Sequence, residues 1–429
     1  MRDILFTLIL PYYVYASIKK PWIGLGFWLW TSCIQVNFLL YGFASSFQIN
    51  RIFALTTIFS YIIGKDKIKM KMNSIYFLFF LYFIWVSISV LISDVHPHSL
   101  HFRYENFVKM FIFFIMACKV LSKKLHIDYV LWMLVISYGA LGCSEGLKYI
   151  ISGGTHTATS IRAINGDNNF AGVMLLTTLP FSIYILSQTK HKILKFGLIG
   201  VVLLLITGIL ATNSRGAFVG LMILGGYFFL KSERKILVFF IFIGIIATAY
   251  NVLPESWFER MDTIENADED DSFMTRVTSW KMSILIAMDN PIFGGGLRAV
   301  EDLKIWHHYK PDFHLLSFIP SSEPDRRFAA HSMFFQVLGD VGFVGLAIYL
   351  SLILATFLKM GGLIRKSKKL QLDDWIVDLL KMMQVSLLVY CASGALISAA
   401  HTEMLFFIFT LTYVIAQQIV YPLEKEIRN

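Results

Sequence analysis

Two basic residues stand out in this sequence because each borders or interrupts a long apolar run. Arg215 lies in the stretch ATNSRGAFVGL, between two runs rich in Leu, Ile, Val and Phe. A guanidinium group stays charged at any accessible pH, so in such surroundings it needs an anionic partner. His331 opens the stretch HSMFFQVLGDVGFVGL, directly after a long polar segment. Because imidazole titrates near neutral pH, these residue types can combine anion binding with proton transfer.

A polar stretch upstream of Arg215, AINGDNNFAG, adds Arg162 and Asn169 as candidates for the same site. A helix that begins near Asp167 or Asn168 would be capped by those side chains. Its positive end would face the same side as Arg215 and favour an anion there. A plainer explanation is that this stretch is only a good helix cap.

A further arginine, Arg276, falls in the segment SFMTRVTSWKMSILIAM within the long polar region 255–330. Apolar residues recur in this segment at helical spacing, namely at Phe273, Val277, Trp280, Ile284 and Met288. The pattern predicts an amphipathic helix at a membrane surface, with Arg276 one turn before Trp280. The plainer explanations are a solvated charge for Arg276, a snorkelling interfacial arginine for Arg215 and a capping or packing role for His331.

The composition indicates the element type that must position these residues. Of the 429 residues, 56% are hydrophobic and only 16% are charged. Several apolar runs reach the roughly 20 residues that a helix needs to cross a bilayer. We therefore predict an all-α, polytopic integral membrane protein with about 12 to 13 transmembrane helices and one large periplasmic loop. The four cysteines lie in or beside apolar runs and are interpreted as packing residues.

The charge pattern predicts how the chain is oriented and divided. Basic clusters occupy every second loop, at residues 19–20, 65–71, 123–124, 190–195, 231–235, 365–369 and 425–428. Such loops face the cytoplasm, which explains the net charge of +9 without a nucleic-acid partner. We divide the chain into N-terminal transmembrane helices (1–254, with the Ser-Arg-Gly turn), a periplasmic loop (255–330) and C-terminal transmembrane helices (331–429).

A metal centre is not predicted from the sequence. Several histidines share the outer side, at positions 96, 98, 101, 307, 308, 314 and 401, but their spacing matches no compact ligand pattern. The acidic residues at 268–271 are better explained as a solvated run than as a divalent-ion site. No cofactor is expected.

The stretch TNSRGAFVGL, followed much later by HSMFFQVLGDVGFVGLAIYL, resembles the O-antigen ligase and O-antigen polymerase superfamily. The NNFAG element and the loop segment RVTSWKMSILIAMDNPIFGGG fit the same resemblance. The N-terminal stretch KKPWIGLGFWLWTSCIQVNFLLYGFA, with DNNFAG and ERMDTI, is similar to the exosortase-associated O-glycosylation ligase branch. Many superfamily members have NPN in place of DNN, and His-Asn in place of His331-Ser332, so glycan and acceptor stay open.

The resemblance implies a GT-C-like glycosyltransferase in the bacterial inner membrane, with its active site facing the periplasm. Such an enzyme moves a glycan from an undecaprenyl-diphosphate-linked donor to an acceptor hydroxyl on lipid A-core, protein or another glycan. Carried over residue by residue, Arg215, Arg276 and Arg162 would hold the donor diphosphate with Asn169 nearby. His331 would activate the acceptor, and the arginines would replace a metal.

Two other functions remain open from the sequence. A polymerase that extends a lipid-linked glycan would use the same outer-face chemistry. A transporter of lipid-linked glycan would instead place ionisable residues near the bilayer midplane. The candidates for that role, Glu145, Lys148 and Glu403, fall near the predicted ends of spans, which disfavours transport.

Overall fold

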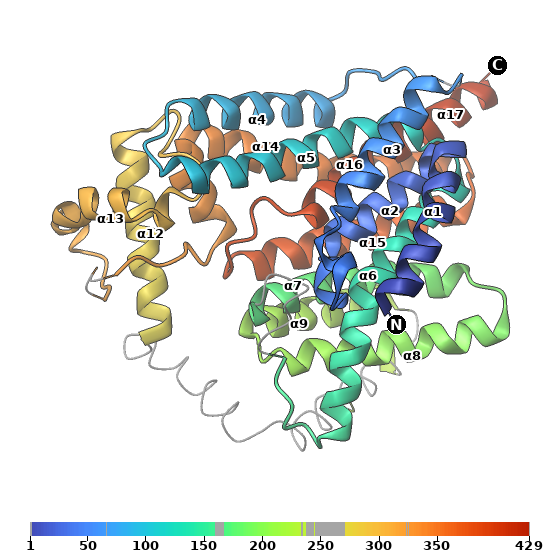
Figure 1. Ribbon diagram of the computed structural model, residues 1–429, viewed down its shortest axis with the longest axis horizontal. Coiled ribbons are helices and arrows are strands. Elements are labelled where there is room, and N and C mark those ends of the chain that lie inside the picture. Colours follow the sequence, from blue (N-terminus) through green and yellow to red (C-terminus); the bar gives the residue numbers. More distant parts are fainter. Residues whose placement is uncertain are drawn as a thin grey trace.

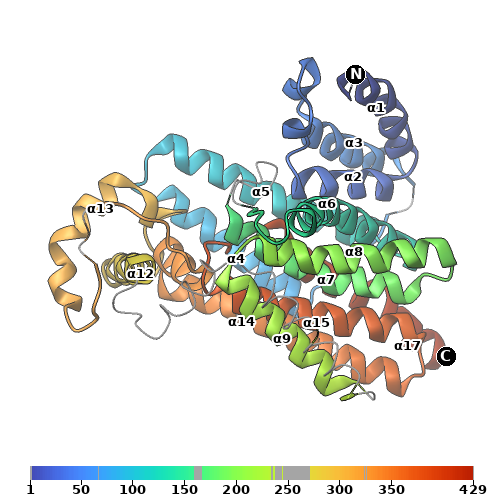
Figure 2. The ribbon, with the colours of Figure 1, turned by 90° about the horizontal axis from the view of Figure 1, so that it is seen from below.

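A computed structural model describes residues 2–65, 67–158, 167–232, 235–236, 244, 271–322, 324 and 326–428. Every regular element in these ranges is helical and none is a strand, which confirms the prediction of an all-α chain. Figure 1 labels the elements and Figure 2 shows them from a second side.

Fifteen α-helices lie within the described ranges. In chain order the α-helices are α1 (Arg2–Lys19), α2 (Pro21–Cys33), α3 (Ile49–Ile63), α4 (Ser74–Leu91), α5 (Pro97–Val120), α6 (Lys124–Ile151), α7 (Asn168–Gln188), α8 (Lys192–Ala211), α9 (Arg215–Lys231), α12 (Asp271–Asp289), α13 (Leu303–Tyr309), α14 (Met333–Lys369), α15 (Asp374–Gly394), α16 (Glu403–Val414) and α17 (Tyr421–Arg428). Short 3-10 helices occupy Val36–Leu39, Phe43–Ser46, Ala299–Glu301 and Lys310–Leu316, and a π-helix covers Ile415–Val420.

Seven helices within the described ranges are long and apolar enough to cross a bilayer. They are Ser74–Leu91, Lys124–Ile151, Asn168–Gln188, Lys192–Ala211, Met333–Lys369, Asp374–Gly394 and Glu403–Arg428. These spans support a polytopic membrane protein. The predicted count of 12 to 13 is larger, and it stays a prediction, because shorter apolar helices such as α3 and the apolar run after residue 236 fall outside this set.

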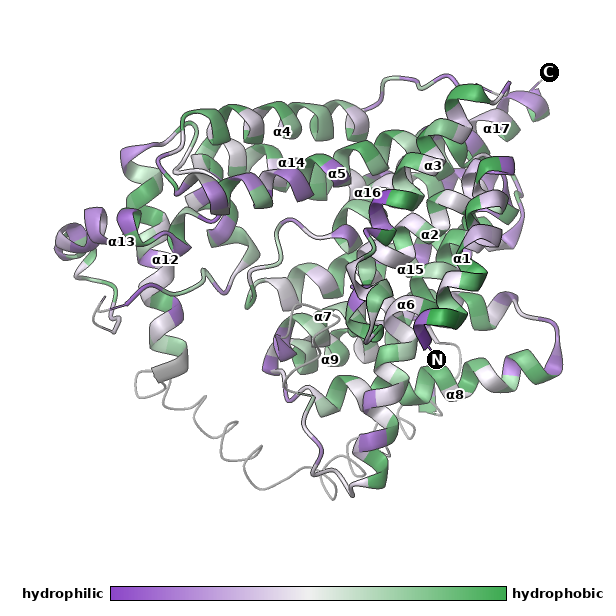
Figure 3. Cartoon of the chain, in the orientation of Figure 1, coloured by the Kyte–Doolittle hydropathy of each residue, from purple (hydrophilic) through white to green (hydrophobic). Residues whose placement is uncertain are grey.

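Several of the long helices run in one direction. In Figure 1, α4, α8 and α14 run along the long axis of the molecule, while α12 crosses that direction, as Figure 2 also shows. The basic loops 65–71 and 190–195 lie with the C-terminus at one end in both views. Hydrophobic residues cover the long helices, and hydrophilic ones gather on α13 and in the connections (Figure 3). The helix at 271–289 confirms the predicted helix of the long polar region.

Glycines bring some helices into close contact. A Cβ atom at Gly146 of α6 would lie 2.1 Å from the carbonyl oxygen of Leu204 in α8, and one at Gly208 would lie 2.4 Å from that of Gly142. Helices in a membrane associate through such close packing, because lipid chains are as apolar as the side chains themselves. Helices α6 and α8 therefore pack closely together beside α7.

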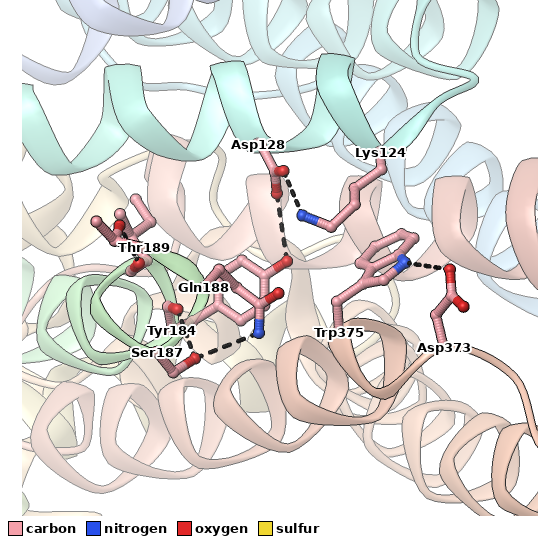
Figure 4. Close-up of polar contacts among 9 residues, drawn as sticks. Lys124, Asp128, Tyr184, Ser187, Gln188, Thr189, Asp373 and Trp375 are labelled. Atoms are coloured by element: carbon pink, nitrogen blue, oxygen red, sulfur yellow. Dashed lines mark hydrogen bonds and ion pairs between the residues drawn. The ribbon is translucent and has the colours of Figure 1, made fainter. Parts of the chain in front are cut away.

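Polar contacts tie α6, α7 and α15 together at the end of α7 that lies away from Asp167 (Figure 4). Asp128 of α6 accepts hydrogen bonds from the ammonium of Lys124 (2.5 Å) and the hydroxyl of Tyr184 (3.2 Å). Lys124 also lies over the Trp375 ring of α15, 5.3 Å from its centroid. These contacts fix the bundle at the end opposite to the candidate site.

Candidate functional site

The turn between α8 and α9 carries Arg215. Helix α9 begins at Arg215 after a break from α8, so the predicted helix break is confirmed. Ser214 caps α9 because its hydroxyl accepts a hydrogen bond from the N–H of Ala217 (3.3 Å). The side-chain amide of Asn168 donates to the carbonyl of Thr212 (2.8 Å). The start of α7 and the Arg215 turn are therefore in direct contact.

The start of α7 has the cap that the sequence predicts. The carboxylate of Asp167 accepts hydrogen bonds from the N–H groups of Asn169 (2.8 Å) and Phe170 (3.3 Å). The Asn169 amide also donates to the side-chain oxygen of Asn168 (3.3 Å). Asn169 thus lies in the first turn of α7, close to the Arg215 turn, while Arg162 lies outside the described residues.

His331 lies just before α14 in a left-handed backbone conformation, with φ of 44°. Few non-glycine residues adopt this conformation, and where they do the strain often marks a functional position. Burial lowers the pKa of the half-buried imidazole, the charges of Arg276 and Arg298 lower it further, and Asp167 opposes them. The ring is therefore neutral near pH 7 and able to accept a proton.

Residues 395–402, the α15–α16 loop, join the two turns. The N–H of His331 donates to the hydroxyl of Ser398 in this loop (2.8 Å). Just before the loop, the hydroxyl of Ser393 donates to the carbonyl of Gly216 (2.8 Å), next to Arg215. One short segment therefore holds the backbone beside both sequence-predicted residues, Arg215 and His331.

Helix α12 brings Arg276 to the same region. The indole N–H of Trp280 donates to the carbonyl of Ala330 (2.9 Å), and its ring stacks on Phe335 with centroids 5.0 Å apart. These contacts attach α12 to the start of α14, and Arg276 is close enough to His331 to affect its charge state. The predicted amphipathic helix thus packs on protein through Trp280.

A cavity of about 340 Å³ opens beside these turns. Its polar wall includes three cations, Arg103, Lys109 and Arg298, and one carboxylate, Glu403. Ser398, which binds the His331 backbone, also lines it, so the cavity adjoins the sequence-predicted site.

The loop that carries Arg298, residues 290–298 and here called the glycine loop, is docked against α14. The N–H groups of Gly295 and Gly296 donate to the carbonyls of Gly339 and Asp340, each at 2.9 Å. The carboxylate of Asp340 accepts from the N–H of Arg298 (2.7 Å), whose φ is 63°. Arg298 then pairs with Glu301 and reaches the carbonyl of Ser398 (3.5 Å).

His401 also faces the cavity, although the sequence singled it out only among the outer histidines. Its Nε2 atom is 2.8 Å from the hydroxyl of Tyr82. Burial, with a smaller contribution from the charge of Arg298, lowers the pKa of His401 to about 3. A neutral imidazole at this position is a hydrogen-bonding group of the wall.

Sequence reasoning missed Arg298, Arg103 and Asp340. Asp340 carried a usable signal, because a carboxylate inside an apolar helix demands a partner. Arg298 follows the three glycines of DNPIFGGG and Leu297, and glycines there indicate a loop without assigning a role to the arginine after it. Arg103 carried no clear signal, because its region is simply polar in the sequence.

Residues 199–350 match the family model described as O-antigen ligase. This match supports the resemblance to the O-antigen ligase superfamily and an O-antigen ligase or polymerase type of function. It includes Arg215, Arg276, Arg298 and His331. Residues 1–192 match a family of unknown function (DUF5935), which includes Arg103. No curated protein matches the chain.

Proposed function

We propose that this protein is an inner-membrane glycosyltransferase of the GT-C-like class, acting as a ligase at the periplasmic face. It transfers a glycan from an undecaprenyl-diphosphate-linked donor to an acceptor hydroxyl on lipid A-core, protein or another glycan. The observation that carries the proposal is the α15–α16 loop. Its N-terminal flank binds the backbone beside Arg215, and Ser398 binds His331.

In the proposed reaction the bond between the anomeric carbon and the diphosphate oxygen breaks, and its electron pair leaves with undecaprenyl diphosphate. Arg215, Arg276 and the capped start of α7 at Asn169 stabilise the charge that develops there. We assign Arg162 to the same diphosphate. Guanidinium groups suit this role because they bind phosphate in a bidentate manner.

The acceptor oxygen forms the new bond from the opposite face, with inversion at the anomeric carbon. His331 takes the hydroxyl proton, and its lowered pKa supports this role because a neutral ring is present at pH 7. The arginines supply the positive charge that a metal would otherwise give, so we propose a metal-independent reaction.

The test measures glycan transfer by the purified protein in excess chelator. The lipid-linked donor is prepared from a deletion strain that accumulates this donor. Arg215→Ala and His331→Ala should each abolish transfer without reducing expression, and Arg215→Lys should remain poor because an ammonium lacks the planar fork. Arg365→Gln, near the far end of α14, is the control. Transfer by Arg215→Ala at the parental rate would refute the proposal, and a ladder of products on one lipid carrier would identify a polymerase.

A further inference from the structure

One face of α5 supplies a polar stripe to the cavity. Arg103, Asn106 and Lys109 recur every three residues, so they neighbour one another on one side of the helix, and all three line the cavity. Lys109 is paired with Glu105 (2.8 Å). Arg103 has no carboxylate partner within the part of the chain that the structure describes, and it contacts the Phe102 ring at 5.8 Å.

Arg103 shares the cavity wall with a second cation, Arg298. It is close enough to Arg298 for the two guanidinium groups to repel each other electrostatically. Of the two, only Arg298 forms an ion pair with a carboxylate among the described residues, that of Glu301, whereas Glu301 and Asp340 attract Arg103 from a longer distance. Two guanidinium groups held together in this way favour an anion between them, and their planar forks match a carboxylate or phosphate group.

The rest of the wall suits a carbohydrate. Trp28, Phe102 and Phe113 supply aromatic faces, while Asn106 and Glu403 supply polar groups that can bind hydroxyls. The Asn106 amide makes no side-chain hydrogen bond among the described residues. The volume, about 340 Å³, falls in the range of small-ligand sites.

We propose that this cavity binds an acidic sugar residue of a substrate glycan, with Arg103 and Arg298 holding its carboxylate and Asn106 its hydroxyls. The inference rests on the proposed function, because it assigns the cavity to one of that reaction's carbohydrates. It also gives a role to the segment that matches a family of unknown function. That segment supplies Arg103 and Asn106, whereas Arg298 comes from the segment that matches O-antigen ligase.

Binding can be tested without any transfer reaction. Saturation-transfer NMR on the full-length protein in nanodiscs would measure the binding of glucuronate and of glucose. Isothermal titration calorimetry on the same sample would measure the binding of inorganic pyrophosphate, which has no C–H protons. We expect glucuronate to bind more tightly than glucose. Arg103→Gln should weaken glucuronate binding roughly tenfold or more through the lost charge-assisted bonds, and leave pyrophosphate binding unchanged. Asn106→Ala should weaken both sugars, and Arg365→Gln should change nothing.

The inference is overturned if glucose binds as tightly as glucuronate, or if Arg103→Gln leaves glucuronate binding intact. It is also overturned if pyrophosphate competes with glucuronate and is weakened equally by Arg103→Gln, because the cavity would then hold the diphosphate. A protein that binds glucuronate as expected but transfers no glycan would support the cavity assignment and contradict only the proposed function. The melting temperatures of all variants are measured to test whether misfolding causes any loss of binding.

Discussion

The Arg215 turn and the glycine loop both present an arginine near one site, yet they are held in different ways. At the Arg215 turn the start of the helix is set locally, because Ser214 caps the helix that Arg215 begins, and the distant residues Asn168 and Ser393 bind the backbone on either side. The glycine loop is fixed by a distant helix, because Asp340 of α14 accepts the N–H of Arg298. A locally held turn is visible in the sequence, whereas one held across the fold is not.

The largest expected effect comes from a substitution that disrupts the packing of the glycine loop against α14. Gly294 has φ of +64°, and a Cβ atom there would lie 2.5 Å from the backbone nitrogen of Gly342. Gly294→Val should therefore destabilise the protein by about 3 kcal/mol or more, through backbone strain and overpacking. Thermal melting in detergent measures this loss. Gly200→Val is the matched control, since nothing lies within 4 Å of that position.

A smaller effect should follow from removing the acceptor that α14 gives to the loop. Asp340→Ala leaves the Arg298 N–H without its partner, at a cost of about 1–3 kcal/mol. Asp340→Asn keeps an acceptor oxygen and should restore most of the stability. Equal melting temperatures for Asp340→Ala and the parent protein would show that the loop does not depend on α14.

The Arg215 turn should be the less sensitive of the two. Ser214→Ala removes one helix cap and should cost about 1 kcal/mol. Ser46→Ala, at an exposed serine of a short 3-10 helix, serves as the control for loss of a hydroxyl. If Ser214→Ala lost more stability than Asp340→Ala, the Arg215 turn would depend on its cap more than the glycine loop depends on α14.

The smallest expected effect is a shift in the pH dependence of the transfer rate, which reports on His331. The pKa of His331 is lowered in the folded protein, so its ring becomes protonated only at a pH below the ordinary pKa of about 6.5. The acidic limb of the transfer rate should therefore have its midpoint below about 6.5. The stability that the protein gains by keeping this ring neutral is present above the pKa of the unfolded state. It is lost as the pH falls from that value through the lower pKa of the folded state. A midpoint at or above about 6.5 would show that His331 is not the base whose protonation limits transfer.

Arg276 and Arg103 show the same contrast as the turn and the loop. The spacing of Phe273 and Trp280 predicted the helix that carries Arg276, and the structure confirms that helix. Arg103 lies on a helix whose polar face lines the same cavity as Arg298, and only the packing of distant segments brings these two arginines together. Helical periodicity is a local property, whereas the presence of two guanidinium groups in one cavity wall depends on how distant helices pack.

The sequence by itself determined the all-helical fold, the break at Arg215 and the cap at Asp167. Each follows from apolar run length or from contacts between residues a few positions apart. Only the tertiary structure decided that the α15–α16 loop adjoins both predicted turns and that Arg103 and Arg298 share a cavity. The reason is physical: a polar group inside a helical bundle finds its partners on other helices, and sequence separation carries no record of which helices pack together.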